Sequence, residues 1–288
     1  MSGFNIDIDY YRHANPDLGS LTDEELRSHY ELHGIAEGRA SSDLALREGL
    51  IALLKQEPSV LEIGPFCNPV VRGKHVRYFD VFNTKDLKAR AKAEGYKYSR
   101  APKIDYVSPN GDLSVINETF TAAVSAHCIE HQPDIIRHLK QVGRLLEPGG
   151  RYYLIVPHKS YCFDYFIAES TIAQMIGAHL EGRTAHRLAS IIEHRALTTH
   201  NDPIRHWNGD HSDAAYEASI VARARPAIAE YNAAGDGYID VHAWQFSPAS
   251  FTTTLSQLHQ LGLSPFTVMA AFETPKPRNE FTAILTLA

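Results

Sequence analysis

The chain has 288 residues, of which 44% are hydrophobic and 22% are charged, enough apolar material for a full core. Its net charge of −6 argues against a nucleic-acid backbone as the main partner, because that partner requires a basic surface. No run of 18 apolar residues occurs, so we expect no membrane span. The start lacks the pattern of a secretory signal, and three cysteines are too few for a disulfide scaffold. We therefore expect a cytoplasmic protein.

Residues 1–42 form the first of three regions. They contain Tyr10-Tyr11-Arg12-His13-Ala14-Asn15-Pro16-Asp17-Leu18 and a helix-like stretch from residue 22 to residue 33. Thr22 followed by Glu25 has the arrangement of a capping box. The pattern resembles a short helical module found beside glycan-modifying and surface-associated bacterial proteins. Two interpretations remain open: a helical hairpin that docks on the core or makes a homo-oligomer, and a targeting or carbohydrate-recognition module.

The second region, residues 43–157, begins with an amphipathic helix through Leu44, Leu46, Leu50, Leu53 and Leu54. An apolar strand over 59–63 follows, and it contains an acidic residue, Glu62, before the turn at Gly64-Pro65. Glycine permits a tight turn and lets backbone N–H groups approach a ligand. Ligands of α/β proteins lie outside the carboxyl ends of parallel strands, so this turn indicates a nucleotide pocket.

Three further strands follow that turn. Val76–Asp80 predicts a second strand that ends in a carboxylate, which could accept hydrogen bonds from both hydroxyls of a ribose. Residues 104–107 predict a third strand, and the loop after it contains Asp112. Residues 120–125 predict a fourth strand, which His127-Cys128-Ile129-Glu130-His131 follows.

A helix is predicted after the fourth strand, because apolar residues recur at helical spacing from 135 to 146. Pro148-Gly149-Gly150 is expected to stop this helix. Residues 151–156 are rich in aromatic and β-branched side chains and predict a fifth strand.

This order of elements resembles the class I S-adenosylmethionine-dependent methyltransferases, especially the branch with ubiquinone-type and sugar-modifying enzymes. The resemblance rests on Leu61-Glu62-Ile63-Gly64, on Ser125-Ala126-His127-Cys128-Ile129-Glu130-His131 and on Arg144-Leu145-Leu146-Glu147-Pro148-Gly149-Gly150. It implies S-adenosyl-L-methionine as cofactor. The cofactor-binding residues that it implies are Glu62, Gly64, Pro65, Asp80, Asp112 and His127. The sequence departs from the family at two usual glycines, where it has Phe66 and Asn68, and Phe66 is expected to narrow the space for methionine.

The third region, 158–288, is expected to choose the substrate. Helices are predicted over 165–180, 184–196, 213–232 and 248–261, the last with Ser247 as N-cap, and two strands over 265–273 and 280–287. The predicted fold is a Rossmann-like, seven-stranded, mostly parallel α/β sheet with an antiparallel C-terminal strand. A helical insertion (158–246) follows strand five, and a small helical extension precedes the domain. We expect two domains, 1–42 and 43–288.

Sixteen histidines are present, and several follow the predicted strands. A hydroxyl acceptor needs a base, and neutral histidine serves near pH 7. The candidates are His127 and His131 after strand four and His158 after strand five. His127 is preferred, because strand four ends beside the transferred methyl group in the family.

The insertion offers a second role for histidines. A divalent ion such as Mg²⁺ or Mn²⁺ could chelate a diol and lower its pKa. The candidate ligands are His200, Asp202, His206, Asp210, His211, Asp240 and His242. Their spacing fits no single ligand motif, and an ordered polar lid explains the same residues. The density of polar and aromatic side chains, including Trp207, Trp244, Tyr161 and Tyr238, favours a polar small molecule or glycan as substrate.

The sequence therefore predicts an O-methyltransferase that acts on a polar, sugar-containing hydroxyl. Two alternatives remain. A dinucleotide-dependent oxidoreductase uses the same first strand and turn, but the second and third glycines of its fingerprint are missing here. A non-catalytic glycan- or partner-binding module would result if Phe66 blocked the methionine site.

Overall fold

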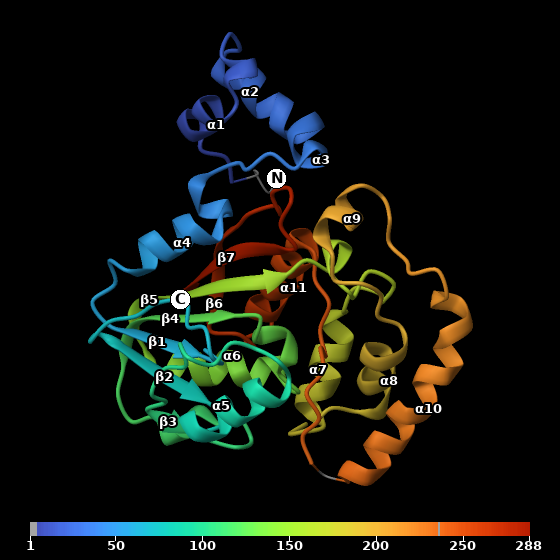
Figure 1. Ribbon diagram of the computed structural model, residues 1–288. Coiled ribbons are helices and arrows are strands. Elements are labelled where there is room, and N and C mark those ends of the chain that lie inside the picture. Colours follow the sequence, from blue (N-terminus) through green and yellow to red (C-terminus); the bar gives the residue numbers. More distant parts are fainter. Residues whose placement is uncertain (1–4, 236) are drawn as a thin grey trace.

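The computed structural model describes residues 5–235 and 237–288 (Figure 1). Seven strands form one sheet in the order β3-β2-β1-β4-β5-β7-β6. The strands are β1 (Val60–Ile63), β2 (Val76–Asp80), β3 (Tyr106–Val107), β4 (Phe120–Ala126), β5 (Leu146–Pro157), β6 (Phe266–Ala271) and β7 (Glu280–Leu287). β7 runs antiparallel to both of its neighbours, β5 and β6, and all the other strand pairs are parallel. The Rossmann-like sheet predicted from the sequence is confirmed, and its order reverses between β1 and β4, where α/β sheets open a ligand crevice.

Helices cover both faces of the sheet. The α-helices of the described residues are α1 (Ile8–Ala14), α2 (Asp23–His29), α3 (Ile35–Glu37), α4 (Arg47–Leu54), α5 (Thr84–Ala93), α6 (Ile135–Arg144), α7 (Ile172–Leu180), α8 (Leu188–Ala196), α9 (Pro203–Trp207), α10 (Tyr216–Ala234) and α11 (Pro248–Gln260). The apolar residues of α6 and α11 pack with Leu61 and Ile63 of β1, whereas those of α4 and α5 pack with Val60. This alternation follows from the two-residue period of a strand.

The predicted stop of the helix before strand five is wrong. The helix α6 ends at Arg144, and Pro148, Gly149 and Gly150 lie inside β5. The pairing of β4 with β5 shifts register between Phe120 and Ala122, and Gly149 has a φ of +75°. The Pro-Gly-Gly segment therefore makes an irregularity inside a strand. Glycine in a strand interior often marks such a bulge or bend.

The insertion between β5 and α11 holds α7, α8, α9 and α10 (Figure 1). The first of these begins at Ile172, seven residues after the predicted start, because Thr171 and Gln174 form a capping box there. The sequence did not predict α9, although Asp202 caps it and Pro203 occupies its first position. Ser247 is the N-cap of α11, as predicted.

The N-terminal extension lies beyond the end of the sheet as a separate group of short helices (Figure 1). The predicted capping box of Thr22 and Glu25 is present. Tyr11, Leu26 and Tyr30 form a small core of their own. The extension is joined to the rest of the chain by the Gly38 carbonyl, which accepts a hydrogen bond of 2.9 Å from the Lys276 amide.

Candidate active site

The turn after β1 requires glycine at position 64. Gly64 has a φ of +69°, and a Cβ added there would lie 3.0 Å from Cys128 Sγ. Glu62 on the strand is buried, and its carboxylate accepts hydrogen bonds from the amides of Val70 and Val71 at 2.6 and 3.1 Å. Burial raises the pKa of Glu62 to about 7, and these amide donors offset part of that effect. Glu62 therefore anchors the loop that follows Gly64.

A cavity of about 510 Å³ opens at the carboxyl ends of β1, β2 and β4. This volume lies in the range of small-molecule sites. Gly64, Pro65, Asp80 and His127 all line the cavity, whereas Glu62 and Asp112 do not. Four of the six residues expected to bind a cofactor thus share one cavity, and the other two do not line it.

Asp80 ends β2 and lies at this cavity almost fully buried. Its Oδ1 accepts a hydrogen bond of 3.1 Å from the Phe82 amide. Burial raises the pKa of Asp80 to about 6 despite backbone hydrogen bonds that favour the ionised form. An acceptor at this strand end is the group that the sequence predicted for a ribose.

Phe66 and Asn68 also line the cavity. Phe66 has a φ of +45°, which is uncommon for a bulky residue and points to a constrained turn. Its ring packs edge-to-face on Tyr96, with centroids 5.8 Å apart. The ring therefore forms part of the wall and leaves the cavity open.

The loop after β3 borders the cavity through Pro109, Asn110, Gly111 and Leu113. Asp112 caps the short turn that follows instead. Its oxygens accept hydrogen bonds from the Ser114 amide at 2.9 Å and from Gln141 Nε2 at 2.6 Å. These bonds, which lower the pKa of Asp112, leave its carboxylate engaged away from the cavity.

The end of β4 carries a second residue with positive φ, His127 at +50°. Its Nε2 lies 2.7 Å from Glu280 Oε2, and Arg47 holds both oxygens of Glu280 at 2.7 Å. Burial raises the pKa of Glu280, but the hydrogen bonds from Arg47 and His127 outweigh it and lower the pKa to about 2. The result is an ionised carboxylate that orients the His127 ring. No role was predicted for Arg47 or Glu280, although a charged residue at the start of a buried strand was a signal.

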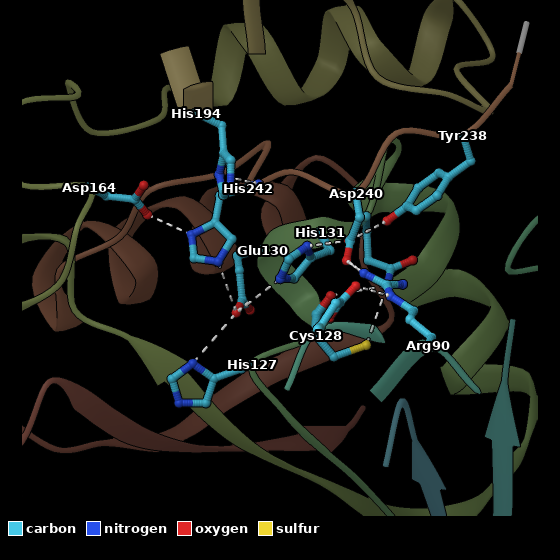
Figure 2. Close-up of polar contacts among 12 residues, drawn as sticks. Arg90, His127, Cys128, Glu130, His131, Asp164, His194, Tyr238, Asp240 and His242 are labelled. Carbon is cyan, nitrogen blue, oxygen red and sulfur yellow. Dashed lines mark hydrogen bonds and ion pairs between the residues drawn. The ribbon is translucent and has the colours of Figure 1, made fainter. Parts of the chain in front are cut away.

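Residues of the insertion complete the cavity. Asp240 lies 2.9 Å from His131 Nδ1 and accepts hydrogen bonds from Arg90 at 2.7 Å and from Tyr238 at 3.1 Å (Figure 2). Burial opposes the ionisation of Asp240, but His131 and Arg90 outweigh it and lower the pKa of this carboxyl well below its usual range. All four residues line the cavity.

The structure does not bring the seven predicted metal ligands together. His200, His206 and His211 stack as rings, with His200 and His206 centroids 4.1 Å apart. Asp202 caps α9, and Asp210 forms an ion pair with Arg205. Asp240 pairs with Arg90 and His131, and His242 pairs with Asp164. Within the described ranges, the side-chain groups able to hold a metal are Glu130–His131–His242 and Asp164–His194–His242. Of the seven predicted residues, these groups contain His242 alone.

His158 is buried and does not line the cavity. Its Nδ1 accepts a hydrogen bond from the Ser160 amide at 3.0 Å, and burial lowers its pKa to about 3. Three of the predicted aromatic platforms also have other contacts: Trp244 belongs to the core, and Tyr161 stacks on Trp207 with centroids 3.9 Å apart. Of the predicted bases, His127 and His131 are at the cavity.

Residues 64–154 match the family model described as a methyltransferase domain. That match covers the loop after β1 through most of β5, which includes the Gly64 turn, Asp80 and His127. The middle of the chain therefore resembles a methyltransferase domain, in agreement with the resemblance predicted from the sequence. No curated protein matches the chain.

Solved structures resemble the chain at low identity. The mitomycin 7-O-methyltransferase MmcR is 10% identical with a TM-score of 0.40, over 98% of this chain and 61% of that one. The CurJ carbon methyltransferase is 14% identical with a TM-score of 0.39, over 99% of this chain and 62% of that one. Magnesium protoporphyrin IX methyltransferase (ChlM) from Synechocystis PCC 6803, with bound SAH, is 10% identical with a TM-score of 0.39, over 98% of both chains. The chain spans about three fifths of the length of the first two.

Within the described residues, no helix combines the length and apolar character that crossing a membrane requires.

Proposed function

We propose that the protein transfers a methyl group from S-adenosyl-L-methionine to a hydroxyl of a polar, sugar-containing acceptor. The observation that carries this proposal is the shared cavity: Asp80, the Gly64 turn and His127 line one space of about 510 Å³. Methyl transfer is an in-line displacement on an activated sulfonium, so the protein must mainly align acceptor, methyl and sulfur. A single cavity bordered by all three elements suits that task.

Asp80 is the proposed ribose acceptor. Its carboxylate is at the end of β2, next to the backbone of the Gly64-Pro65 turn, and both border the cavity. Phe82 and Leu113 add apolar surface to the same wall, which suits an adenine ring. Glu62 supports this half of the site indirectly, because it holds the amides of Val70 and Val71.

His127 is the proposed base. Its Nε2 faces the ionised Glu280, which fixes the ring and stabilises the imidazolium that forms when the other nitrogen takes a proton. A positive φ directs this side chain into a position that a regular strand end does not provide. His127 Nδ1 then removes the proton of the acceptor hydroxyl as its oxygen attacks the methyl group.

The acceptor half is proposed to lie against the insertion, residues 158–246. Tyr238, Asp240 and Arg90 offer an aromatic ring, a carboxylate and a guanidinium beside one another at the cavity. Vicinal hydroxyls of a sugar pair with such planar groups, and a tyrosine ring provides an apolar face for the pyranose. The proposed Mg²⁺ or Mn²⁺ assistance by the seven insertion residues finds no support in their separate contacts.

The proposed test is methyl transfer with labelled cofactor to three matched acceptor panels: free and nucleotide-linked sugars, catechols, and amines. We expect incorporation into the sugar panel, a product 14 daltons heavier (one CH₂), and loss of incorporation in His127→Ala. Incorporation only into amines or catechols would overturn the acceptor class. Cofactor binding without any transfer would favour the non-catalytic module, and binding of a dinucleotide in place of S-adenosylmethionine would favour the oxidoreductase.

The N-terminal residues 1–42 are proposed to be a separate module that docks on the 43–288 domain and supports a homo-oligomer. Its own core of Tyr11, Leu26 and Tyr30 and its limited contacts with the rest of the chain support that division. A version that starts at residue 43 should keep cofactor binding and lose self-association in analytical ultracentrifugation. Unchanged self-association would contradict the oligomer role.

A further inference from the structure

Glu130 is a buried carboxylate without a hydrogen bond. Its side chain has no exposed surface, and neither Oε1 nor Oε2 has a hydrogen-bond partner among the described residues. An isolated ionised carboxylate in a protein interior is costly, so such groups are paired or bind a metal. The surroundings of Glu130 therefore decide what the residue does.

Three imidazole nitrogens surround one oxygen of this carboxylate (Figure 2). His131 Nε2 is 3.9 Å and His242 Nε2 is 3.8 Å from Glu130 Oε1. His127 Nδ1 is 3.9 Å from the same oxygen. These distances are too long for hydrogen bonds. They leave the space that a cation between the groups would occupy.

In each of the three rings, the nitrogen that does not face Glu130 lies beside a different carboxylate. His242 Nδ1 lies 2.6 Å from Asp164 Oδ2, and His131 Nδ1 lies 2.9 Å from Asp240 Oδ1. His127 Nε2 lies 2.7 Å from Glu280 Oε2. Histidines that bind metals in proteins commonly donate their second N–H to a carboxylate in this way, which fixes the tautomer and makes the ligand nitrogen more basic.

The backbone fixes this arrangement across a large sequence separation. The Glu130 carbonyl accepts hydrogen bonds from the amides of Ala243 at 2.7 Å and Trp244 at 3.2 Å. These bonds join the short 3-10 helix Ile129–His131 to the segment that carries His242. The His131 and His242 rings also meet edge-to-face, with centroids 4.6 Å apart. The ligands thus rest on a defined scaffold at the edge of the cavity, which His131 lines.

We propose that Glu130, His131 and His242 bind one transition-metal ion of the Zn²⁺ type, beside His127. The ligand atoms of the three residues lie within 4.8 Å of one another. Nitrogen and oxygen ligands about 2.0–2.2 Å from a tetrahedral ion stand about 3.3 Å apart, so the widest ligand pair must close by up to about 1.5 Å when the ion binds. Two imidazoles with one carboxylate suit Zn²⁺ or Fe²⁺, whereas Mg²⁺ prefers oxygen ligands alone.

Three protein ligands leave a coordination position for a further oxygen, as in catalytic zinc sites. If the proposed function holds, the acceptor hydroxyl occupies that position, because the cavity and His127 adjoin it. The metal would lower the pKa of the hydroxyl, and His127 would take its proton. Metal binding itself does not depend on that chemistry.

The test uses the full chain, stripped with a chelator and titrated with Zn²⁺ in a calorimeter, with bound metal counted by mass spectrometry. Co²⁺ absorption then reports the coordination number. We expect one ion per chain with a tetrahedral or five-coordinate Co²⁺ spectrum. Glu130→Gln and His242→Gln should each remove stoichiometric binding, and Asp164→Asn should weaken it about 10–100-fold. His200→Gln and His211→Gln are matched controls from the stacked ring group and should bind as the wild type does.

The wild-type titration alone can overturn the inference. If the wild type binds no stoichiometric ion, the inference is wrong whatever the variants do. Equal binding by wild type, Glu130→Gln and His242→Gln would also contradict it. Circular dichroism and thermal unfolding identify a variant that fails to fold. S-adenosylmethionine binding is measured separately on the stripped protein. Metal binding without cofactor binding would support this inference and overturn the proposed function. Cofactor binding without metal binding would support the proposed function and overturn this inference.

Discussion

His127 Nε2 and Glu280 Oε2 lie 2.7 Å apart, which connects the end of β4 to the first residue of β7 across 153 positions of sequence. Arg47 completes the link by holding both Glu280 oxygens. The helix α4, the end of the parallel sheet and its antiparallel strand therefore meet at the proposed base. This connection explains why a charged residue is tolerated in a strand that is otherwise buried.

Substitutions of His127 and of the Glu280 carboxylate beside it should impair catalysis more than cofactor binding. His127→Ala should lower kcat by about 10²–10⁴-fold, the usual contribution of a general base. Glu280→Gln keeps the size of the side chain but loses the charge that orients and stabilises the imidazolium. We therefore expect a smaller fall in kcat than in His127→Ala, with KM for S-adenosylmethionine unchanged. Steady-state kinetics measure both. Glu48→Gln, which removes only the exposed ion pair with Arg278, is the control. Equal kcat in Glu280→Gln and wild type would show that Glu280 does not assist His127 in catalysis.

Glu280 should also contribute to acid sensitivity. Its pKa in the folded chain is about 2, below the ordinary value of 4.5, so its contribution to stability is fully present above about pH 4.5. That contribution is lost as pH falls from there toward 2. Melting temperatures measured from pH 6 to pH 2.5 should fall less steeply for Glu280→Gln than for the wild type. Parallel curves would show that the ion pair is not formed.

Cofactor affinity should depend on pH through Asp80. Burial raises its pKa to about 6, so the carboxylate is ionised above that pH and becomes protonated below it. A protonated carboxyl is a weaker acceptor for the ribose hydroxyls, and affinity should fall by up to about tenfold per pH unit below 6. Calorimetric titrations between pH 5 and pH 8 measure this slope. Asp80→Asn should remove it, whereas Asp86→Asn, on the exposed start of α5, should retain it. A slope that persists in Asp80→Asn would assign the titration to another group.

Gly64→Ala should destabilise the chain more than an equivalent change elsewhere. The added methyl group meets Cys128 Sγ at 3.0 Å, and the positive φ costs about 1–2 kcal/mol for an alanine. Gly95→Ala is the matched control, since Gly95 has a φ of +78° and open space around it. Urea unfolding should show a larger loss for Gly64→Ala, partly restored in the Gly64→Ala, Cys128→Ala double variant. Equal losses at the two glycines would mean that the contact with Cys128 is unimportant.

The sheet could be predicted from the sequence because its strands are short apolar runs that end in turn residues. Val76–Asp80 and Glu280–Leu287 have the predicted bounds. The start of α7 was misjudged, since the cap formed by Thr171 and Gln174 determines where that helix begins and apolar spacing does not. The Pro-Gly-Gly segment was misread because the same residues end helices and interrupt strands.

The site could be predicted only where a residue acts from a strand end. Gly64 and Asp80 face the cavity for that reason, whereas Asp112 caps its own turn, a local role that the sequence does not distinguish from ligand binding. Pairings such as Glu130 with His242 depend on tertiary folding over 112 positions, which no spacing reveals. The stacked histidines of 200–211 looked like ligands because they are dense in sequence, but they pair with each other and with neighbours.

A calorimetric titration of the full chain with S-adenosylmethionine at pH 7.5 tests the central claim most directly. We predict one site per chain, with affinity lowered at least about tenfold in Asp80→Asn, because the buried carboxylate is the proposed ribose acceptor. Absence of binding heat in the wild type, or equal affinity in Asp80→Asn, would contradict the assignment of this cavity to the cofactor.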